Sequence, residues 1–337
     1  MAQEGQKLRL TRRSCIGVLG ALGVFGLMGG APVRAQNKVV ETISQGGFFM
    51  SDVEHFLATH NTLGEGSLWS VAEQTLYWVD IVNDCYWRLN PQTGAPEVVP
   101  VGSSIGVMAQ RASGGLVMAT RHNFAFWGAD NALHPIGQPV TTDPTIRFND
   151  GAVDCRGRFW AGTMNNAELP ISMLYRLDPD GSIHTMETNV RVSNGIGWSP
   201  DNTVMYFTDS PLRIIYAYDF DAETGGIANR RTFVHLPDEP GVPDGLTVDS
   251  EGCVWSCYWD GAKIIRFTPS GQIERIIPMP VLRPTSCVFG GPDLDELYIT
   301  SAFVDLTPEQ KARYPFSGDL FRLKTGMRGL PKFTFKG

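Results

Sequence analysis

The chain has 337 residues and a formal net charge of −7, and 42% of its residues are hydrophobic and 10% aromatic. This composition is sufficient for a large buried core, and no segment is biased enough to predict disorder. The acidic balance repels phosphate groups, which argues against nucleic acids and anionic membranes as partners.

Residues 1–35 have the order of an export signal that is removed from the mature protein. Basic residues come first, an apolar stretch follows at 15–28, and small residues stand at Val33 and Ala35. Arg12-Arg13 directly before the apolar stretch resembles a twin-arginine signal, which predicts export of the folded protein to a bacterial periplasm. An uncleaved anchor is the alternative. Since this segment carries five basic residues and one acidic residue, its removal leaves a net charge of −11.

A pattern of short strands then recurs six times at intervals of 40 to 50 residues. In each repeat a buried strand is followed by a second strand rich in aromatic and β-branched residues, and then by a third. Repeats of this length that consist only of strands predict a β-propeller with one four-stranded sheet per repeat. The first strands are marked by the pairs Glu65-Gly66, Ile105-Gly106, Asp150-Gly151, Asn194-Gly195, Asp244-Gly245 and Thr285-Ser286.

The sixth repeat has almost no chain left for a fourth strand. Residues 53–60 precede the first repeat and can supply that strand, which would join both ends of the chain in one sheet and remove an exposed edge. We therefore expect an all-β fold, a six-bladed β-propeller closed by an N-terminal strand. It forms a single domain over residues 53–337, after an N-terminal extension at 36–52.

Glu65, Asn194 and Asp244 occupy the same position, directly before glycine, in three different repeats. In a propeller the innermost strand of each blade lines the axis, so we expect these side chains to converge there. Two carboxylates and an amide oxygen form a hard oxygen site for a divalent cation. A single Asp-Gly or Asn-Gly pair would be an ordinary turn, but recurrence in three repeats favours the metal site.

Six motifs occur in a fixed order along these repeats: Leu63-Gly64-Glu65-Gly66, Arg147-Phe148-Asn149-Asp150-Gly151, residues 158–164, Ser193-Asn194-Gly195, Pro243-Asp244-Gly245-Leu246 and residues 285–291. Together they resemble the SMP-30/gluconolactonase/regucalcin-like family over roughly residues 63–302. The resemblance implies a six-bladed propeller that hydrolyses sugar lactones to aldonic acids with one divalent cation on the axis.

The resemblance also implies roles for individual residues. Glu65, Asn194 and Asp244 match the metal ligands of the family, and Arg147 and Asn149 match its contacts to substrate. The implied reaction is polarisation of the lactone carbonyl by the cation and attack by an activated water. Asp244 is our candidate to act both as a ligand and as the general base. A structural ion pair within the channel is the alternative role for Arg147.

The chain departs from the family pattern after residue 164. Animal-type members carry paired acidic residues near the substrate, where this chain reads Asn165-Asn166-Ala167-Glu168. We expect Asn166, or a shifted Glu168, to contact substrate hydroxyls. Gluconolactone, xylonolactone and arabinolactone therefore all remain candidate substrates. The cation can be calcium, zinc, manganese, magnesium or iron(II), and the protein is expected to be a monomer or a weak dimer without a membrane association after signal removal.

Other functions compete with the lactonase. The same site would suit hydrolysis of other esters or organophosphates, and a non-catalytic propeller would bind calcium or a partner protein through the channel. Arg147 and Asn149 favour the enzyme, because a structural ion needs neither. Ser104 lies in a GxSxG pattern, but that motif needs a strand-to-helix elbow, which this sequence does not predict. The five cysteines of the mature chain are read as buried free thiols, with a disulfide between blades as the alternative.

Overall fold

The structure is a computed structural model that describes residues 53–337. The predicted export signal and the predicted extension at 36–52 lie outside the described residues. Within the described part, no helix is long and apolar enough to cross a membrane.

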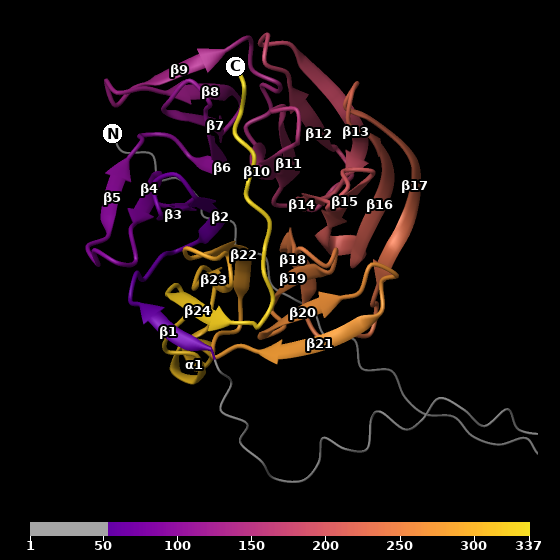
Figure 1. Cartoon of the computed structure of the whole chain (residues 1–337). Helices are drawn as coiled ribbons and strands as arrows, with labels where there is room; N and C mark the ends of the chain where they lie inside the picture. Colours follow the sequence, from indigo (N-terminus) through magenta and orange to yellow (C-terminus); the bar gives the residue numbers. More distant parts are fainter. Residues whose placement is uncertain (1–52) are drawn as a thin grey trace, which may run out of the picture. The chain divides into compact units, whose positions relative to one another are not determined.

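The described residues form six four-stranded antiparallel sheets arranged as blades around a central axis (Figure 1). The first three blades, each from the innermost strand outward, are β2 (Gly64–Ser70), β3 (Thr75–Asp80), β4 (Cys85–Leu89) and β5 (Glu97–Pro100); β6 (Ile105–Gln110), β7 (Leu116–Thr120), β8 (Phe124–Trp127) and β9 (Leu133–Ile136); and β10 (Ile146–Val153), β11 (Phe159–Asn165), β12 (Ser172–Leu177) and β13 (Ile183–Val190). The next two are β14 (Ser193–Trp198), β15 (Val204–Asp209), β16 (Ile214–Asp221) and β17 (Gly226–His235); and β18 (Val242–Val248), β19 (Val254–Trp259), β20 (Lys263–Phe267) and β21 (Ile273–Pro278).

The sixth blade joins the two ends of the propeller, as the sequence predicted. It consists of β22 (Pro284–Gly290), β23 (Glu296–Ser301), β24 (Leu320–Lys324) and, as the outer strand, β1 (Glu54–Leu57). Glu54 lies opposite Arg322 in the register of β1 and β24, and their side chains form an ion pair at 2.8 Å. This pairing covers the edge of β24.

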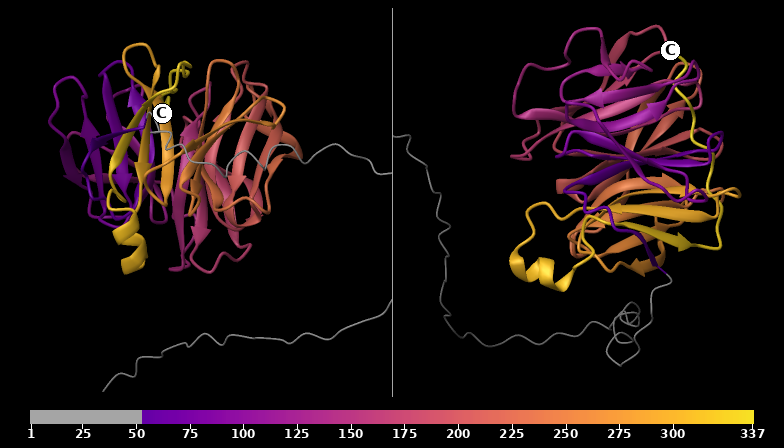
Figure 2. Two further views of the ribbon diagram at one scale, coloured as in Figure 1. Left: turned by 90° about the horizontal axis from the view of Figure 1, so that it is seen from below. Right: turned by 90° about the vertical axis from the view of Figure 1, so that its left-hand side faces the viewer.

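The loop between β23 and β24 contains a short helix, α1 (Pro308–Arg313), which the sequence analysis did not predict. Thr307 begins it with a capping box, in which its hydroxyl accepts from the Gln310 backbone and the Gln310 side chain accepts from the Thr307 backbone. A 3₁₀ turn, η1 (Ser210–Leu212), follows β15. In Figure 2, α1 projects from one face of the propeller and the C-terminus lies at the opposite face.

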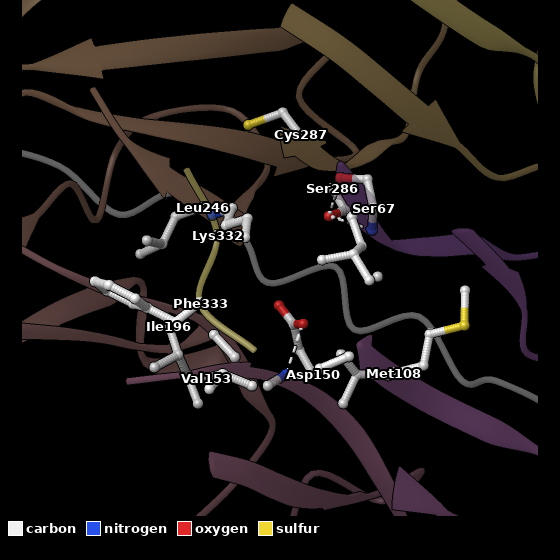
Figure 3. Close-up of a pocket in the computed structure, with 16 residues that line it drawn as sticks. Ser67, Met108, Asp150, Val153, Ile196, Leu246, Ser286, Cys287, Lys332 and Phe333 are labelled. Carbon is white, nitrogen blue, oxygen red and sulfur yellow. Dashed lines mark hydrogen bonds between the residues drawn. The ribbon is translucent and has the colours of Figure 1, made fainter. Parts of the chain in front are cut away.

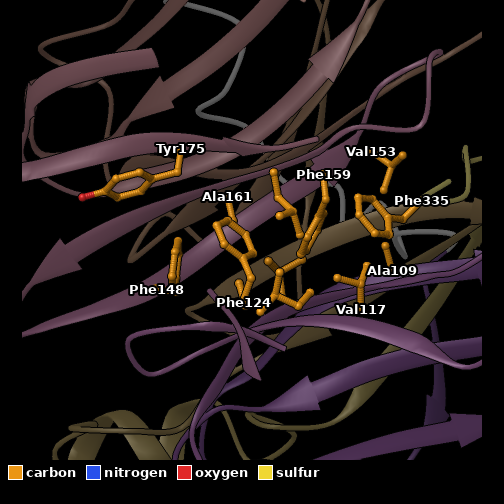
Figure 4. Close-up of a cluster of buried hydrophobic side chains, with 13 residues drawn as sticks. Ala109, Val117, Phe124, Phe148, Val153, Phe159, Ala161, Tyr175 and Phe335 are labelled. Carbon is orange, nitrogen blue, oxygen red and sulfur yellow. The ribbon is translucent and has the colours of Figure 1, made fainter. Parts of the chain in front are cut away.

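The hydrophobic core lies between neighbouring blades. Trp78, Trp160 and Trp255, on the second strands of three blades, have no exposed surface. Between the second and third blades, Phe124, Phe148 and Phe159 pack face to edge or at a tilt, with ring centroids 4.7 to 5.7 Å apart (Figure 4). The packing of whole blades against each other therefore fixes how the inner strands are placed around the axis.

Residues 325–337, which we call the C-terminal strap, leave β24 and run across one face of the propeller (Figure 1). Phe335 near its end is fully buried and completes the core cluster between the second and third blades (Figure 4). No sequence motif marks this segment.

Candidate functional site

All six innermost strands share one irregularity in their pairing. The register to the second strand shifts at the marked pair of each repeat, for example between Glu65 and Leu68 and between Pro243 and Leu246; the pair contains a glycine in the first five repeats and is Thr285-Ser286 in the sixth. Such β-bulges change the direction in which local side chains point, and they are common next to functional sites. The sequence repeat and the bulge thus coincide, because the marked pairs are the residues of the bulge.

The glycines of these pairs allow the inner strands to approach closely. A Cβ atom on Gly195 would lie 2.8 Å from the backbone oxygen of Asp244, and one on Gly245 would lie 2.7 Å from that of Thr285. Any side chain at these positions would push neighbouring blades apart. The residue before each of these glycines, which is polar in four of the five pairs, is therefore held on a tightly packed ring of strands.

A continuous network of hydrogen bonds joins three blades at the start of their inner strands. The Arg147 guanidinium donates to Asn149 Oδ1 at 2.6 Å, and Asn149 Nδ2 donates to Asn194 Oδ1 at 2.8 Å. Asn194 Nδ2 donates to Ser210 Oγ at 2.8 Å, and this hydroxyl donates to the carbonyl of Pro243 at 2.6 Å. The network fixes the side chains of Arg147, Asn149 and Asn194 relative to one another.

Three buried carboxylates, those of Glu65, Asp150 and Asp244, lie in the same region without a basic side chain bonded to any of them within residues 53–337. Burial raises the pKa of Glu65 to about 8, and the charge of Asp150 contributes. Burial also raises the pKa of Asp150 to about 6. The pKa of Asp244 is raised well above its usual value by burial and by the charge of Glu65. In each case the cause is loss of hydration around the charged form, with mutual repulsion added for Glu65 and Asp244.

Arg147 is the basic residue of the network, and its positive charge acts on Glu65 and Asp244. Burial lowers its pKa to about 10, while the charges of Glu65 and Asp244 oppose that change. A guanidinium with a pKa of about 10 still carries its charge at neutral pH. One cation facing three carboxylates leaves a negative excess, and together with the amide oxygen of Asn194 this donor set fits a divalent cation.

Asn166 lies apart from the network. It is exposed in the turn that follows β11, and its side chain makes no hydrogen bond to any described residue. The turn is nevertheless at the same mouth of the channel as Arg147, because Met164 pairs with Arg147 across β10 and β11. Neighbouring Asn165 is buried instead and holds the turn through Leu169. The role of Asn166 in substrate binding stays a prediction.

Asp150, Ser210 and Lys332 lie in the site but were not predicted from the sequence. Asp150 could have been predicted, because Asp150-Gly151 is one of the six repeat marks. Ser210 follows β15 and has no counterpart in the repeat. Lys332 belongs to the C-terminal strap and carries no motif.

Below the network, the channel contains a cavity of about 50 Å³, which has room for a few water molecules. The hydroxyls of Ser67 and Ser286 face it and are 2.9 Å apart. Asp150 and Lys332 also line it (Figure 3). This cavity extends the polar site along the axis.

A second group of possible metal ligands in the described residues is Asp249, Glu251 and Cys253. Arg266 is bonded to both carboxylates, at 2.8 Å to Asp249 and at 2.6 Å to Glu251. A guanidinium therefore already bonds both carboxylates and offsets the buried charge of Asp249 without a metal.

Two further sequence candidates are settled by the geometry. Ser104 directly precedes β6 and no helix follows that strand, so the elbow that a nucleophilic serine requires is missing from this part of the described chain. All five cysteines of the described residues are unpaired, and four of them are buried. The reading as buried thiols thus holds, apart from partly exposed Cys155.

Comparison with known proteins connects this geometry to a family. The pattern described as SMP-30/Gluconolactonase/LRE-like region matches residues 63–303. Regucalcin of Danio rerio is 35% identical over 85% of this chain and 98% of its own length. A pentonolactonase of Haloferax volcanii is 38% identical over 83% and 97%. A 6-deoxy-6-sulfogluconolactonase of Pseudomonas putida is 36% identical over 82% and 95%. The matched residues contain every member of the hydrogen-bond network and all three axial carboxylates.

Proposed function

Because the chain belongs to the SMP-30/gluconolactonase/LRE-like family, we propose that it hydrolyses the ring ester of a sugar lactone to the aldonic acid. The observation that carries this proposal is the set of three buried carboxylates beside the Arg147–Asn149 pair. Relatives named for pentonolactone and sulfogluconolactone hydrolysis support the substrate class. The names of these relatives give different sugars, so an assay with several aldonolactones is needed to identify the substrate of this protein.

Glu65, Asn194 and Asp244 would hold one divalent cation. Their oxygens suit calcium, magnesium and manganese best, while zinc and iron(II) accept the same donors. When bound, such a cation stabilises the negative charge that develops on the lactone carbonyl oxygen during attack. It also offsets the repulsion among the carboxylates.

Asp244 is the proposed general base. Its raised pKa makes the carboxylate a stronger proton acceptor than an exposed aspartate. It would take a proton from the attacking water as the new carbon–oxygen bond forms. The ring carbon–oxygen bond then breaks, and the same proton returns to the leaving alkoxide. The products are a carboxylic acid and a free hydroxyl, so that only water is consumed.

Arg147 and Asn149 would orient the substrate. Two acceptors, Asn149 Oδ1 and the carbonyl of Phe148, lie 2.6 and 2.9 Å from one nitrogen of the Arg147 guanidinium. The other guanidinium N–H groups form no hydrogen bond with described residues and can donate to ring hydroxyls or to the carbonyl. A side chain held in this way loses little rotamer freedom when substrate binds.

We also propose that the enzyme acts in a bacterial periplasm, on lactones produced by sugar oxidation outside the cytoplasm. The support for this is the order of residues 1–35 and the arginine pair in it. The acidic mature chain is in keeping with a small uncharged substrate rather than a polyanion.

The test is acid release from a panel of aldonolactones, measured at controlled pH with residues 36–337 stripped of metal and resupplied with each cation in turn. We expect ring opening above the spontaneous rate only with added cation. The isosteric change Asp244→Asn should lower kcat at least about 100-fold, the lower range for loss of a general base. Asp238→Asn, an exposed aspartate near the same mouth, is the matched control.

Two results would contradict the proposal. Metal-loaded, folded protein that accelerates no lactone would point to another ester substrate or to a binding propeller. Equal activity of Asp244→Asn and Asp238→Asn would remove Asp244 from the chemistry while leaving the lactonase intact.

A further inference from the structure

The C-terminal strap is fixed on both sides of the channel. On one side Gly329 pairs with Asp249, directly after β18, and the backbone of Ser250 donates to the carbonyl of Arg328 at 2.8 Å. A Cβ on Gly329 would lie 2.1 Å from Cβ of Phe289, so the backbone lies directly on that ring. This end of the strap is anchored on the fifth and sixth blades.

The other side is anchored on the second and third blades. Phe335 exchanges backbone hydrogen bonds with Gln110 at 2.8 Å and Ala112 at 2.7 Å, directly after β6. Its buried ring fixes it further, and the backbone of Lys336 donates to the carbonyl of Gly157 at 3.0 Å. Since Asp249 and Arg111 both follow the ends of inner strands, the strap crosses the mouth opposite to the one that holds Arg147.

Lys332 lies in the middle of this span and points into the channel (Figure 3). Its ammonium donates to Thr247 Oγ1 on β18 at 3.1 Å. Asp150 on β10 and Cys287 on β22 line the same cavity. Burial lowers the pKa of Lys332, and Asp150 and Cys287 oppose that change. Among residues 53–337, Asp150 supplies the only carboxylate that lines this cavity together with the Lys332 side chain.

We propose that Lys332 is a fixed internal cation that closes the far end of the channel and weakens the affinity of the axial site for divalent cations. The inference rests on the proposed function, since it concerns the same site. Two anchors hold the strap, so the ammonium cannot withdraw when a metal enters. It offsets part of the negative charge of Asp150, which lines the same cavity, and repels a second positive charge brought to the axial site.

This role predicts that removing the charge of Lys332 strengthens the binding of divalent cations, whereas a general disruption of the structure would weaken it. Loosening the strap would disorder the inner strands and weaken metal binding. Removing only the charge leaves the carboxylates with less compensation, so that they attract a divalent ion more strongly. Lys332→Met keeps the length and the apolar stem of the side chain and removes only the ammonium.

The test compares metal-stripped protein, residues 36–337, as wild type, Lys332→Met and Lys332→Arg. Lys336→Met is the matched control, because Lys336 is exposed on the same strap. The dissociation constants of Ca²⁺ and Mn²⁺ are measured by titration calorimetry at pH 8.5 and low ionic strength. We expect Lys332→Met to bind both ions about tenfold more tightly, the order expected for one charge acting on a divalent ion across a hydrated cavity. Lys332→Arg and Lys336→Met should stay within about twofold of the wild type, because both keep the charge inside the channel.

The outcomes separate this inference from the proposed function. If the wild type binds no divalent cation, the axial metal site itself is wrong and Lys332 has nothing to tune. If the wild type binds the ions and Lys332→Met binds them equally or more weakly, the lactonase proposal stands and the role of Lys332 is overturned.

Discussion

Two regions of this propeller bury carboxylates. Two carboxylates within the blades are each paired with arginine, and those on the axis have no bonded basic side chain among the described residues. Within the blades, Asp249 has no exposed surface and accepts from both Arg266 and the indole of Trp255. Asp154 is equally buried and bonded to Arg158 and Trp160. On the axis, the only hydrogen bonds that Glu65 and Asp150 receive from residues 53–337 come from the backbone of the glycine that follows each.

This difference in hydrogen-bond partners determines whether the carboxylates of each region need a further cation. A carboxylate bonded to a guanidinium, an indole and backbone N–H groups is satisfied and needs no further partner. Carboxylates that share a small buried volume without such partners destabilise the protein unless a cation joins them. The axial set therefore stores unfavourable electrostatic energy in the metal-free state, and the paired sites do not.

The largest expected effect on stability comes from removing the arginine that is paired with a buried carboxylate within a blade. Arg266→Met would leave Asp249 buried without its cation, and we expect it to lower the free energy of unfolding by about 3–5 kcal/mol. Urea unfolding followed by tryptophan fluorescence measures this loss. Lactonase activity per folded molecule should be unchanged, since Arg266 lies in the fifth blade and outside the network.

The partner change provides the control. Asp249→Asn combined with Arg266→Met removes both charges, and it should recover part of the stability that the single variant loses. If the single variant is as stable as the wild type, Asp249 does not depend on Arg266 and the comparison fails.

The next effect concerns the pH dependence of the metal-free protein. The pKa values of Asp150 and Glu65 are raised on folding, to about 6 and about 8, so the folded protein binds more protons than the unfolded chain between pH 4 and 8. Stability of the metal-free protein therefore falls as pH rises through this range. Denaturant unfolding across this pH range, with chelator present, measures it.

Two additions sharpen this experiment. Asp150→Asn should flatten the curve mainly between pH 4 and 6, because its own titration is removed. A saturating divalent cation should restore stability at pH 8. A metal-free protein whose stability is flat across the range would show that the axial carboxylates are not strained by one another.

Much of this arrangement is predictable from the sequence, because it repeats. The six four-stranded blades expected from the repeat are observed, and the six marked pairs, five of which contain a glycine, locate the six bulges. Glu65, Asn194 and Asp244 were selected because they share one position in the repeat. The same marks contain Asp150, which was not assigned to the site from the sequence although it shares that position in the repeat.

The segments of the chain that do not repeat could not be predicted from the sequence. The C-terminal strap has no periodic pattern, and its course depends on one ring, Phe335, that fits a gap between two blades. The position of Lys332 follows from that course and not from any local motif. Ser210 enters the site because η1 turns it toward Pro243, which is a tertiary contact.

Ser210 allows the smallest and most specific test of the comparison, because it holds the axis by neutral hydrogen bonds. Ser210→Ala removes the partner of Asn194 Nδ2 and leaves a buried N–H group unsatisfied, which should cost about 1–2 kcal/mol of stability. Asn194 would then turn more freely, so we expect a larger increase in the dissociation constant of the cation than in KM for the lactone. Calorimetry and initial rates measure the two, with exposed Ser250→Ala as the control. A change in KM alone would show that Ser210 serves substrate binding. A change in cation affinity would show that the ligands on the axis are positioned by neutral hydrogen-bond partners, whereas the paired carboxylates within the blades are stabilised by arginine.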